Sequence, residues 1–126
     1  MAAELPDPAT VEELFEGNPL GVEVCRRVEA LLDAVGPFEV RVSRSQVGFR
    51  AGRGFAYVWS PERWLDHPDA RVVLSLAMGH EHESPRFKEV VHPSKGVWMH
   101  HLEVHSLDDL DDEVAGWLRT AYDERG

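Results

Sequence analysis

The sequence lacks the features that place a chain in a membrane or in an oxidising compartment. Cys25 is the only cysteine, so no disulfide can form within the chain. No apolar run approaches the roughly 20 residues that span a bilayer. The first ten residues have neither the basic start nor the apolar segment of a signal peptide. We therefore expect a cytoplasmic protein that makes no contact with a membrane.

Positive charge is scarce and is concentrated in one segment. The 126 residues include 23 acidic and 13 basic side chains, for a net charge of −10. Residues 36–53 are the exception, because they hold four arginines and a single acidic residue, Glu39. General nucleic-acid binding needs a continuous basic surface, so this charge balance argues against it. A local site for an anion on the basic segment is still compatible with the composition.

Motifs for catalysis are also missing. The sequence has no G-x-S-x-G, no H-E-x-x-H and no glycine-rich phosphate loop. Cys25 falls beside the apolar stripe of a predicted helix, where a buried thiol is unreactive. The sequence therefore favours a protein that is not an enzyme, while an uncharacterised hydrolase without an evident nucleophile stays open as an alternative.

Helical patterns occupy both ends of the chain. Thr10–Glu13 has the form of a capping box. Apolar residues then repeat at helical spacing from Leu20 to Val35, and Gly36 is expected to end that helix. A last helix is expected to begin at Ser106 and to present an apolar stripe as far as Ala121.

Between these helices the hydrophobic period changes from helical to alternating. About six strands are predicted, over 38–43, 47–49, 55–59, 71–78, 87–92 and 97–105. Consecutive strands with short connections should pair antiparallel, and the terminal helices should cover one face of the sheet. The expected fold is a single two-layer α+β domain over 10–126, after a short flexible lead-in over 1–9. The outer strand over 87–92 is compatible with either a monomer or a homodimer.

The first candidate site is a basic and aromatic surface on the predicted sheet. Its residues are Arg41, Arg44, Gln46, Arg50, Tyr57 and Trp59, with His101 on the last strand. Guanidinium groups bind phosphate or carboxylate, and an aromatic neighbour offers a surface for stacking. This interpretation requires Tyr57 and Trp59 to lie on the face that the helices leave open, which the sequence does not decide. The alternative is an ordinary solvated sheet face.

The second candidate site involves histidine, because six of the seven histidines lie between residues 80 and 105. In the polar loop His80–Glu83, alternate side chains can point toward one ion, so His80, His82 and Glu83 are candidate ligands for zinc or iron. No complete ligand spacing is present, and surface histidines are the alternative. His100 is better explained as a residue at the edge of the core that is hydrogen-bonded to backbone.

A third candidate is the acidic charge at the two ends of the chain. The residues concerned are Glu12, Glu13, Glu16, Asp108, Asp109, Asp111, Asp112 and Glu113. Clustered carboxylates can collect iron, since hard cations prefer oxygen ligands. The alternative is that acids in the first turn of a helix complement its dipole.

Several segments resemble a bacterial family of domains of unknown function. The matching segments are Val28 to Gly36, Arg44 to Phe49, Phe55 to Trp59, Arg71 to Leu76, Trp98 to Val104 and Leu110 to Tyr122. The resemblance implies a domain found alone or as a C-terminal module of restriction-associated or nuclease-like proteins, some of them labelled predicted transport proteins. It implies no catalytic residues. The order of helices and strands is also similar, more distantly, to the frataxin-like iron-handling fold and to YdhG-type domains.

These observations lead to one hypothesis and an alternative. The hypothesis is a non-enzymatic module that binds an anionic small molecule, a nucleotide or a partner protein on the basic and aromatic surface. The alternative is a protein that handles iron or zinc in the manner of frataxin. No cofactor is required by the sequence.

Overall fold

The computed structural model describes residues 10–61 and 70–126. Its helices are α1 (Val11–Leu14), α2 (Pro19–Asp33), the short 3-10 helix η2 (Leu107–Asp109) and α3 (Asp112–Arg125). Its strands are β1 (Glu39–Val42), β2 (Val47–Arg50), β3 (Gly54–Trp59), β4 (Val72–Met78), β5 (Phe87–Ser94) and β6 (Val97–Val104). The lead-in predicted over 1–9 lies outside the described residues, as do residues 62–69 between β3 and β4.

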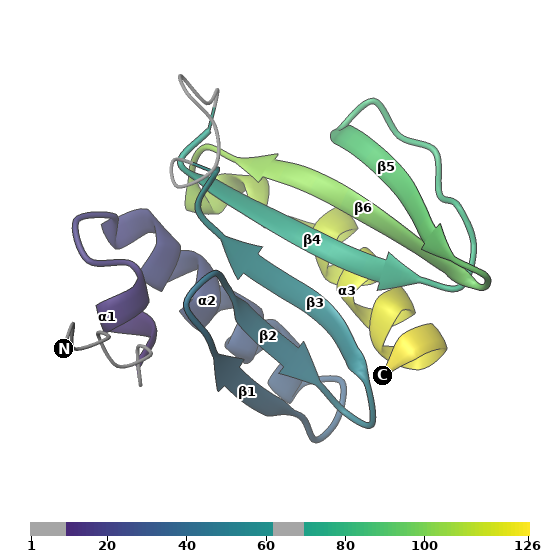
Figure 1. Cartoon of the computed structure of the whole chain (residues 1–126), viewed down its shortest axis with the longest axis horizontal. Helices are drawn as coiled ribbons and strands as arrows, with labels where there is room; N and C mark the ends of the chain where they lie inside the picture. Colours follow the sequence, from purple (N-terminus) through teal and green to yellow (C-terminus); the bar gives the residue numbers. More distant parts are fainter. Residues whose placement is uncertain (1–9, 62–69) are drawn as a thin grey trace, which may run out of the picture.

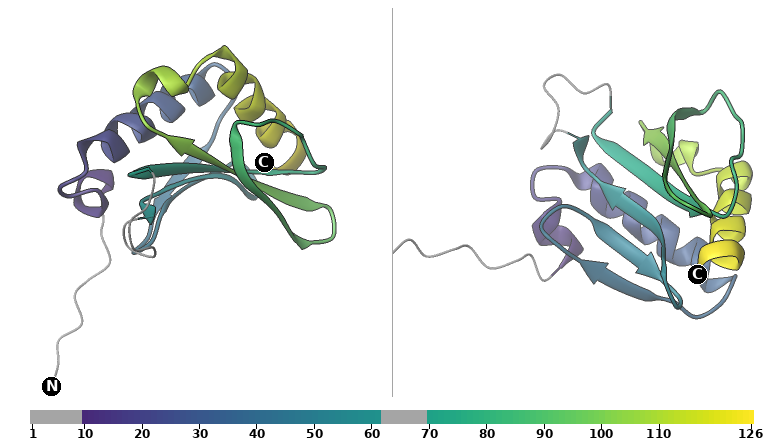
Figure 2. Two further views of the ribbon diagram at one scale, coloured as in Figure 1. Left: turned by 90° about the horizontal axis from the view of Figure 1, so that it is seen from above. Right: turned by 45° about the vertical axis from the view of Figure 1, so that its right-hand side comes forward.

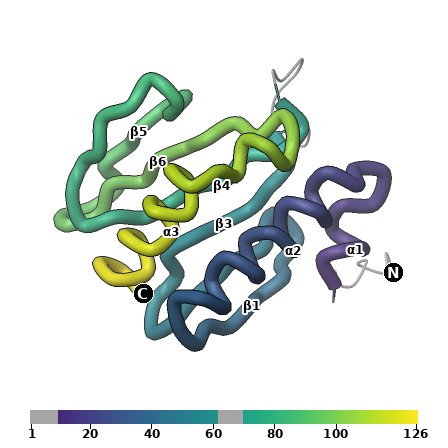
Figure 3. Tube along the Cα trace, turned by 180° about the vertical axis from the view of Figure 1, so that it is seen from behind, coloured from purple at the N-terminus to yellow at the C-terminus, as the bar shows by residue number. Residues whose placement is uncertain are grey.

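The six strands form one antiparallel sheet in the order β1-β2-β3-β4-β6-β5 (Figure 1). Both long helices, α2 and α3, lie across the same face of this sheet (Figure 3). Seen edge-on, the helices form one layer and the sheet forms the other (Figure 2). The two-layer α+β architecture predicted from the sequence is confirmed.

One strand pairing differs from the expectation that consecutive strands pair. β4 pairs with β6, and β5 lies beyond β6 at the edge of the sheet. The segment 79–86 between β4 and β5 is long enough to carry the chain past the position that β6 later fills. The tight turn at Lys95–Gly96 then returns β6 between the two, and Gly96 takes a positive φ of 76° there.

Strand alternation divides the sheet into a covered face and an open face. In β4, Leu74 and Leu76 belong to the core cluster beneath the helices, while the residue between them, Ser75, points to the other side. All seven residues of β4 are buried, as its apolar run predicted. Cys25 is also in the core, where burial raises the pKa of its thiol to about 12.

The C-terminal end of α2 differs from the prediction, whereas the capping of α1 agrees with it. Thr10 caps α1 as expected, since its hydroxyl accepts a hydrogen bond from the Glu13 amide at 3.1 Å. Asn18 precedes α2 but makes no capping bond, and its side-chain amide instead donates to the Arg71 carbonyl at 2.9 Å. Gly36 does not end the helix, which already stops at Asp33. A side chain at Gly36 would collide with Tyr122, because a Cβ there would lie 2.5 Å from its hydroxyl.

The start of the last helix is also corrected. Ser106 and Asp109 form a capping box, but this box caps the start of the short helix η2 and not the start of α3. α3 begins at Asp112, where Asp111 accepts a hydrogen bond from the Val114 amide at 3.1 Å. Two capping residues therefore follow one another, Ser106 at the start of η2 and Asp111 at the start of α3. Among the described helices, none is both long enough and apolar enough to cross a membrane.

Candidate functional site

The open face of the sheet carries a continuous row of residues, one from each strand. The strand registers align Arg41, Gly48, Tyr57, Ser75, His101 and Glu89 across β1, β2, β3, β4, β6 and β5. Their neighbours along the strands, such as Val58 and Leu102, belong to the core under the helices. Tyr57 and Trp59, whose side the sequence did not decide, therefore lie on the face that the helices leave open.

A hollow of about 200 Å³ lies on this face over β1, β2 and β3. It is lined by Arg41, Gln46, Arg50 and Tyr57, together with Ser43, Gly48, Phe49 and Gly54. The structure thus brings together four of the seven residues proposed for the basic and aromatic surface. Trp59 and His101 lie farther along the same face, and Arg44 is exposed in the turn between β1 and β2 without lining the hollow.

Two glycines make room for the Tyr57 ring over β2. A Cβ at Gly48 would meet the ring at 3.5 Å, which is an ordinary contact. A Cβ at Gly54 would lie 2.1 Å from the Tyr57 hydroxyl oxygen, far closer than two atoms can approach. The ring therefore lies where a side chain at position 54 would otherwise stand, and it forms one wall of the hollow.

The arginines give the hollow a positive rim. The Arg50 guanidinium donates to the Gly52 carbonyl at 3.0 Å, and within residues 10–61 and 70–126 no carboxylate pairs with it. Arg41 has only a loose ion pair, with 3.9 Å between its Nη2 and the Glu39 carboxylate, and its side chain is 66% exposed. Donors that are only partly occupied in this way remain able to bind an anion.

The turn before β2 orients the remaining polar side of the hollow. Its Ser43 hydroxyl accepts hydrogen bonds from the amides of Ser45 and Gln46, at 3.4 and 3.3 Å. The Ser43 amide in turn donates to the Gln46 carbonyl at 2.9 Å. Because these bonds hold the backbone at Gln46, its side-chain amide is presented at the edge of the hollow.

A second group on the open face joins Trp59, Ser75 and His101. The Trp59 indole nitrogen donates to the Ser75 hydroxyl at 2.8 Å, and that hydroxyl lies 2.6 Å from His101 Nδ1. An indole nitrogen is only a donor, so the Ser75 proton points to His101. Burial lowers the pKa of His101, which keeps the ring neutral and able to accept this bond.

Ser75 and His101 have the separation of a nucleophile and its base, but the surroundings do not suit catalysis. Ser75 is only 3% exposed and lies in the middle of β4. The backbone amides around it bond to β3 and β6, so they are not free to form an oxyanion hole. The pair therefore orients Trp59 and His101. Sequence reasoning missed Ser75, although it is the one polar residue in the run Val72–Met78.

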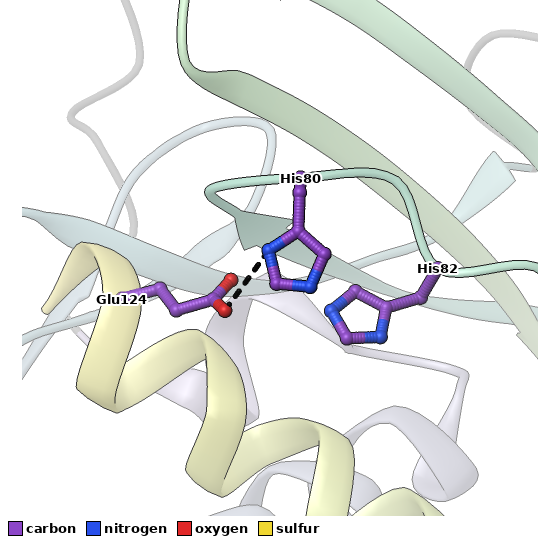
Figure 4. A group of neighbouring side chains, drawn as sticks. All are labelled: His80, His82 and Glu124. Atoms are coloured by element: carbon purple, nitrogen blue, oxygen red, sulfur yellow. Dashed lines mark ion pairs between the residues drawn. The ribbon is translucent and has the colours of Figure 1, made fainter.

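The predicted histidine loop meets the C-terminal end of α3. His80, His82 and Glu124 present ligand atoms that lie within 4.8 Å of one another (Figure 4). Glu83, which the sequence proposed as the third ligand, is exposed and does not belong to this group. Glu124 supplies the carboxylate, and nothing in the local spacing indicated it.

The buried His100 ring is hydrogen-bonded to the backbone of this loop. It is fully buried, with its Nδ1 3.2 Å from the Leu76 carbonyl, while its Nε2 accepts a hydrogen bond from the His82 amide at 2.9 Å. Burial lowers the pKa of His100, so the ring is neutral with its proton on Nδ1. The prediction of a core-edge histidine bonded to backbone is confirmed.

Three of the eight acidic residues named as the third candidate form ion pairs within the fold. Glu12 forms an ion pair with Arg26. Asp111 and Glu113 both bind Arg86, at 3.0 and 2.8 Å. These contacts are those of ordinary surface ion pairs and helix caps, which supports the structural interpretation of the acidic ends.

Comparison with known proteins places the whole fold in one family model. The model described as Domain of unknown function (DUF5655) matches residues 11–125, which include all the described helices and strands. No curated protein and no solved structure matches the chain. The family description names no function, so any functional conclusion depends on the geometry of the sites described above.

Proposed function

The chain belongs to the DUF5655 family, and we propose that its function is to bind a small organic anion in the hollow on the open face of the sheet. One observation carries this proposal: Arg41, Arg50 and Tyr57 converge on the same hollow although the chain as a whole has a net charge of −10. A local positive site in an acidic protein selects for anions near it without making the protein bind polyanions in general.

The lining suggests the chemical class of the ligand. Arg41 and Arg50 suit a phosphate or carboxylate group, which guanidinium binds with two parallel hydrogen bonds. The Tyr57 ring offers a surface on which a planar group stacks, and Gln46 offers a donor and an acceptor for its edge. A volume of about 200 Å³ is small for a binding site, which favours a ligand no larger than a mononucleotide over a folded partner protein.

Binding without catalysis is the better interpretation of this site. The described residues that line the hollow include no carboxylate, imidazole or thiol that would act as a general base or nucleophile. The nearest dyad, Ser75 and His101, is used to orient Trp59. A site built from donors and an aromatic wall holds an anion and does not transform it.

Calorimetric titration with adenosine monophosphate, benzoate, inorganic phosphate and adenosine tests the proposal. We expect a planar anion to bind more tightly than either phosphate or adenosine, since each of these lacks one half of the recognised chemistry. Each hydrogen bond to a charged group contributes about 1.5–3 kcal/mol, so the double variant Arg41→Gln/Arg50→Gln should weaken binding by about a hundredfold or more.

The matched control is Arg27→Gln/Arg53→Gln, which removes the same charge from exposed arginines outside the hollow. This variant should keep the affinity of the unmodified protein within about twofold. Equal losses in the two double variants would show that only net charge matters, and an unchanged affinity in the Arg41/Arg50 variant would show that the ligand binds elsewhere. Circular dichroism spectra of all variants check that the fold is retained.

A further inference from the structure

Two histidines and a carboxylate converge at the end of the sheet that lies beside the last turn of α3. His80 and His82 come from the loop after β4, and Glu124 comes from α3 (Figure 4). His80 Nδ1 lies 3.1 Å from the Glu124 Oε2 atom. The rings of His80 and His82 lie close together, with 4.2 Å between their centroids. This group is separate from the hollow, whose residues all come from positions 41–57.

These separations match those of ligands around a metal ion. Ligand atoms at about 2.1 Å from a tetrahedral zinc ion lie about 3.4 Å apart. The three side chains offer atoms within 4.8 Å of one another, so small side-chain rotations are enough to reach that geometry. Two neutral imidazoles and one carboxylate are ligands that Zn²⁺ accepts readily, and they occur together in its catalytic sites.

Hydrogen bonds outside the group hold the two protein segments in place. One Glu124 oxygen accepts from the Gly79 amide at 2.8 Å, which leaves its other oxygen directed at His80. The His82 amide donates to the buried His100 ring at 2.9 Å. Such supporting contacts orient the ligands of known metal sites and raise their affinity. Here they hold both ends of the segment Gly79–His82.

One polar atom in the group is not otherwise satisfied. The Nε2 atom of His82 is buried and, among the described residues, has no hydrogen-bond partner. In Figure 4 a nitrogen of this ring faces His80. A buried nitrogen without a partner destabilises a fold, and native structures seldom leave such an atom uncompensated. A metal ion bound by Nε2 would satisfy this atom.

We propose that His80, His82 and Glu124 form a binding site for a divalent transition-metal ion, with Zn²⁺ as the ion that fits best. The bound ion joins the loop between β4 and β5 to the C-terminal turn of α3. The His80 side chain is 59% exposed, so a further ligand position faces solvent and takes water or a small anion. The site lies outside the hollow and functions independently of it.

The experiment uses the full chain without an affinity tag, freed of metal with a chelator that is then removed. Zn²⁺ is titrated by calorimetry, and Co²⁺ is titrated by visible absorption, which reports its ligand geometry. We expect one ion per chain, an absorption spectrum of a low-symmetry four- or five-coordinate site, and a rise in the unfolding temperature that increases with metal concentration.

Two variants test the assignment of the ligands. Glu124→Gln keeps an oxygen for the Gly79 amide, and His82→Gln keeps the backbone bond to His100, so both should fold. Each should weaken Zn²⁺ binding by about tenfold or more. His105→Gln is the control, because His105 is exposed and lies outside the group. Failure to bind one Zn²⁺ per chain, or an affinity unchanged in both ligand variants, would overturn the proposal.

Discussion

The hollow on the sheet and the histidine loop beside α3 are assembled in opposite ways. The hollow takes its residues from three strands that follow one another in the chain, and its Arg41 side chain is 66% exposed. The group of His80, His82 and Glu124 joins the loop after β4 to the helix α3. The backbone of this loop is hydrogen-bonded to His100, which is fully buried. One site is therefore a surface of adjustable charged groups, and the other is held by hydrogen bonds to the core.

This difference predicts how each region responds to change. Exposed arginines contribute mainly charge, so their loss should affect ligand affinity and leave the free energy of unfolding almost unaltered. Residues that support the loop also fill the core, so their loss should reduce stability and metal affinity together. Substitutions of single residues test whether ligand affinity and stability respond separately in the hollow and together in the histidine loop.

The largest effect is expected for His100→Ala. The change opens a cavity and leaves the Leu76 carbonyl and the His82 amide without their present partner. We expect a loss of about 2–4 kcal/mol in the free energy of unfolding, measured by urea denaturation. Zn²⁺ affinity should fall, while anion binding in the hollow should persist. His105→Ala serves as the control, and equal destabilisation by the two changes would mean that His100 does not support the loop.

A smaller effect is expected from pH. Burial lowers the pKa of both His100 and His101 below the ordinary value of 6.5, although contacts such as Glu89 with His101 partly oppose this. The unfolded chain therefore binds protons at a higher pH than the folded chain does, and stability should decrease as the pH falls below about 6.5. Urea denaturation at a series of pH values measures this slope.

His101→Gln should make that slope shallower, because one of the two imidazoles with a lowered pKa is then absent. The fold should tolerate this change, since glutamine is also polar and the position is only partly buried. A slope identical to that of the unmodified protein would show that His101 does not contribute to the pH dependence.

The smallest effect on stability is expected for alanine substitutions at Gly48 and Gly54, the two glycines that lie next to Tyr57. In Gly54→Ala the new methyl group would displace the tyrosine hydroxyl, whereas in Gly48→Ala it would make an ordinary contact with the ring. Alanine inside a strand changes stability by only about 0.5–1 kcal/mol. We expect Gly54→Ala to weaken anion binding by about tenfold through the moved ring. Gly48→Ala also adds a methyl group to the lining but leaves the ring in place, so it should weaken binding less. Equal affinities would show that the position of Tyr57 is not important.

Features of the two sites that depend on local sequence patterns could be predicted from the sequence. Alternation along strands placed Arg41 and Tyr57 in the correct elements, because side chains in a strand switch faces at every residue. The strand predicted over 47–49 stopped one residue short of Arg50, which belongs to β2. The face itself followed only from the sheet, where Tyr57 aligns with Gly48 and Ser75. Local patterns also found the helices, although competing caps moved the start of α3 to Asp112.

Long-range features could not be found in this way. Glu124 approaches His80 because α3 packs back across the sheet, whereas Glu83 is closer in the sequence but does not belong to the group. The pairing of β4 with β6 similarly depends on a chain reversal that follows β5. Each of these depends on how complete elements pack, and a spacing rule within one segment contains no such information.

An amide NMR titration of the intact chain with adenosine monophosphate tests most directly whether the hollow on the open face binds an anion. Chemical-shift changes should concentrate at Gly48, Arg50 and Gly54, whose backbone borders the hollow, and Gly79 beside the histidine loop should stay unchanged. Changes confined to residues outside β1, β2 and β3, or saturation without any change at these positions, would contradict the assignment of the hollow as the anion site.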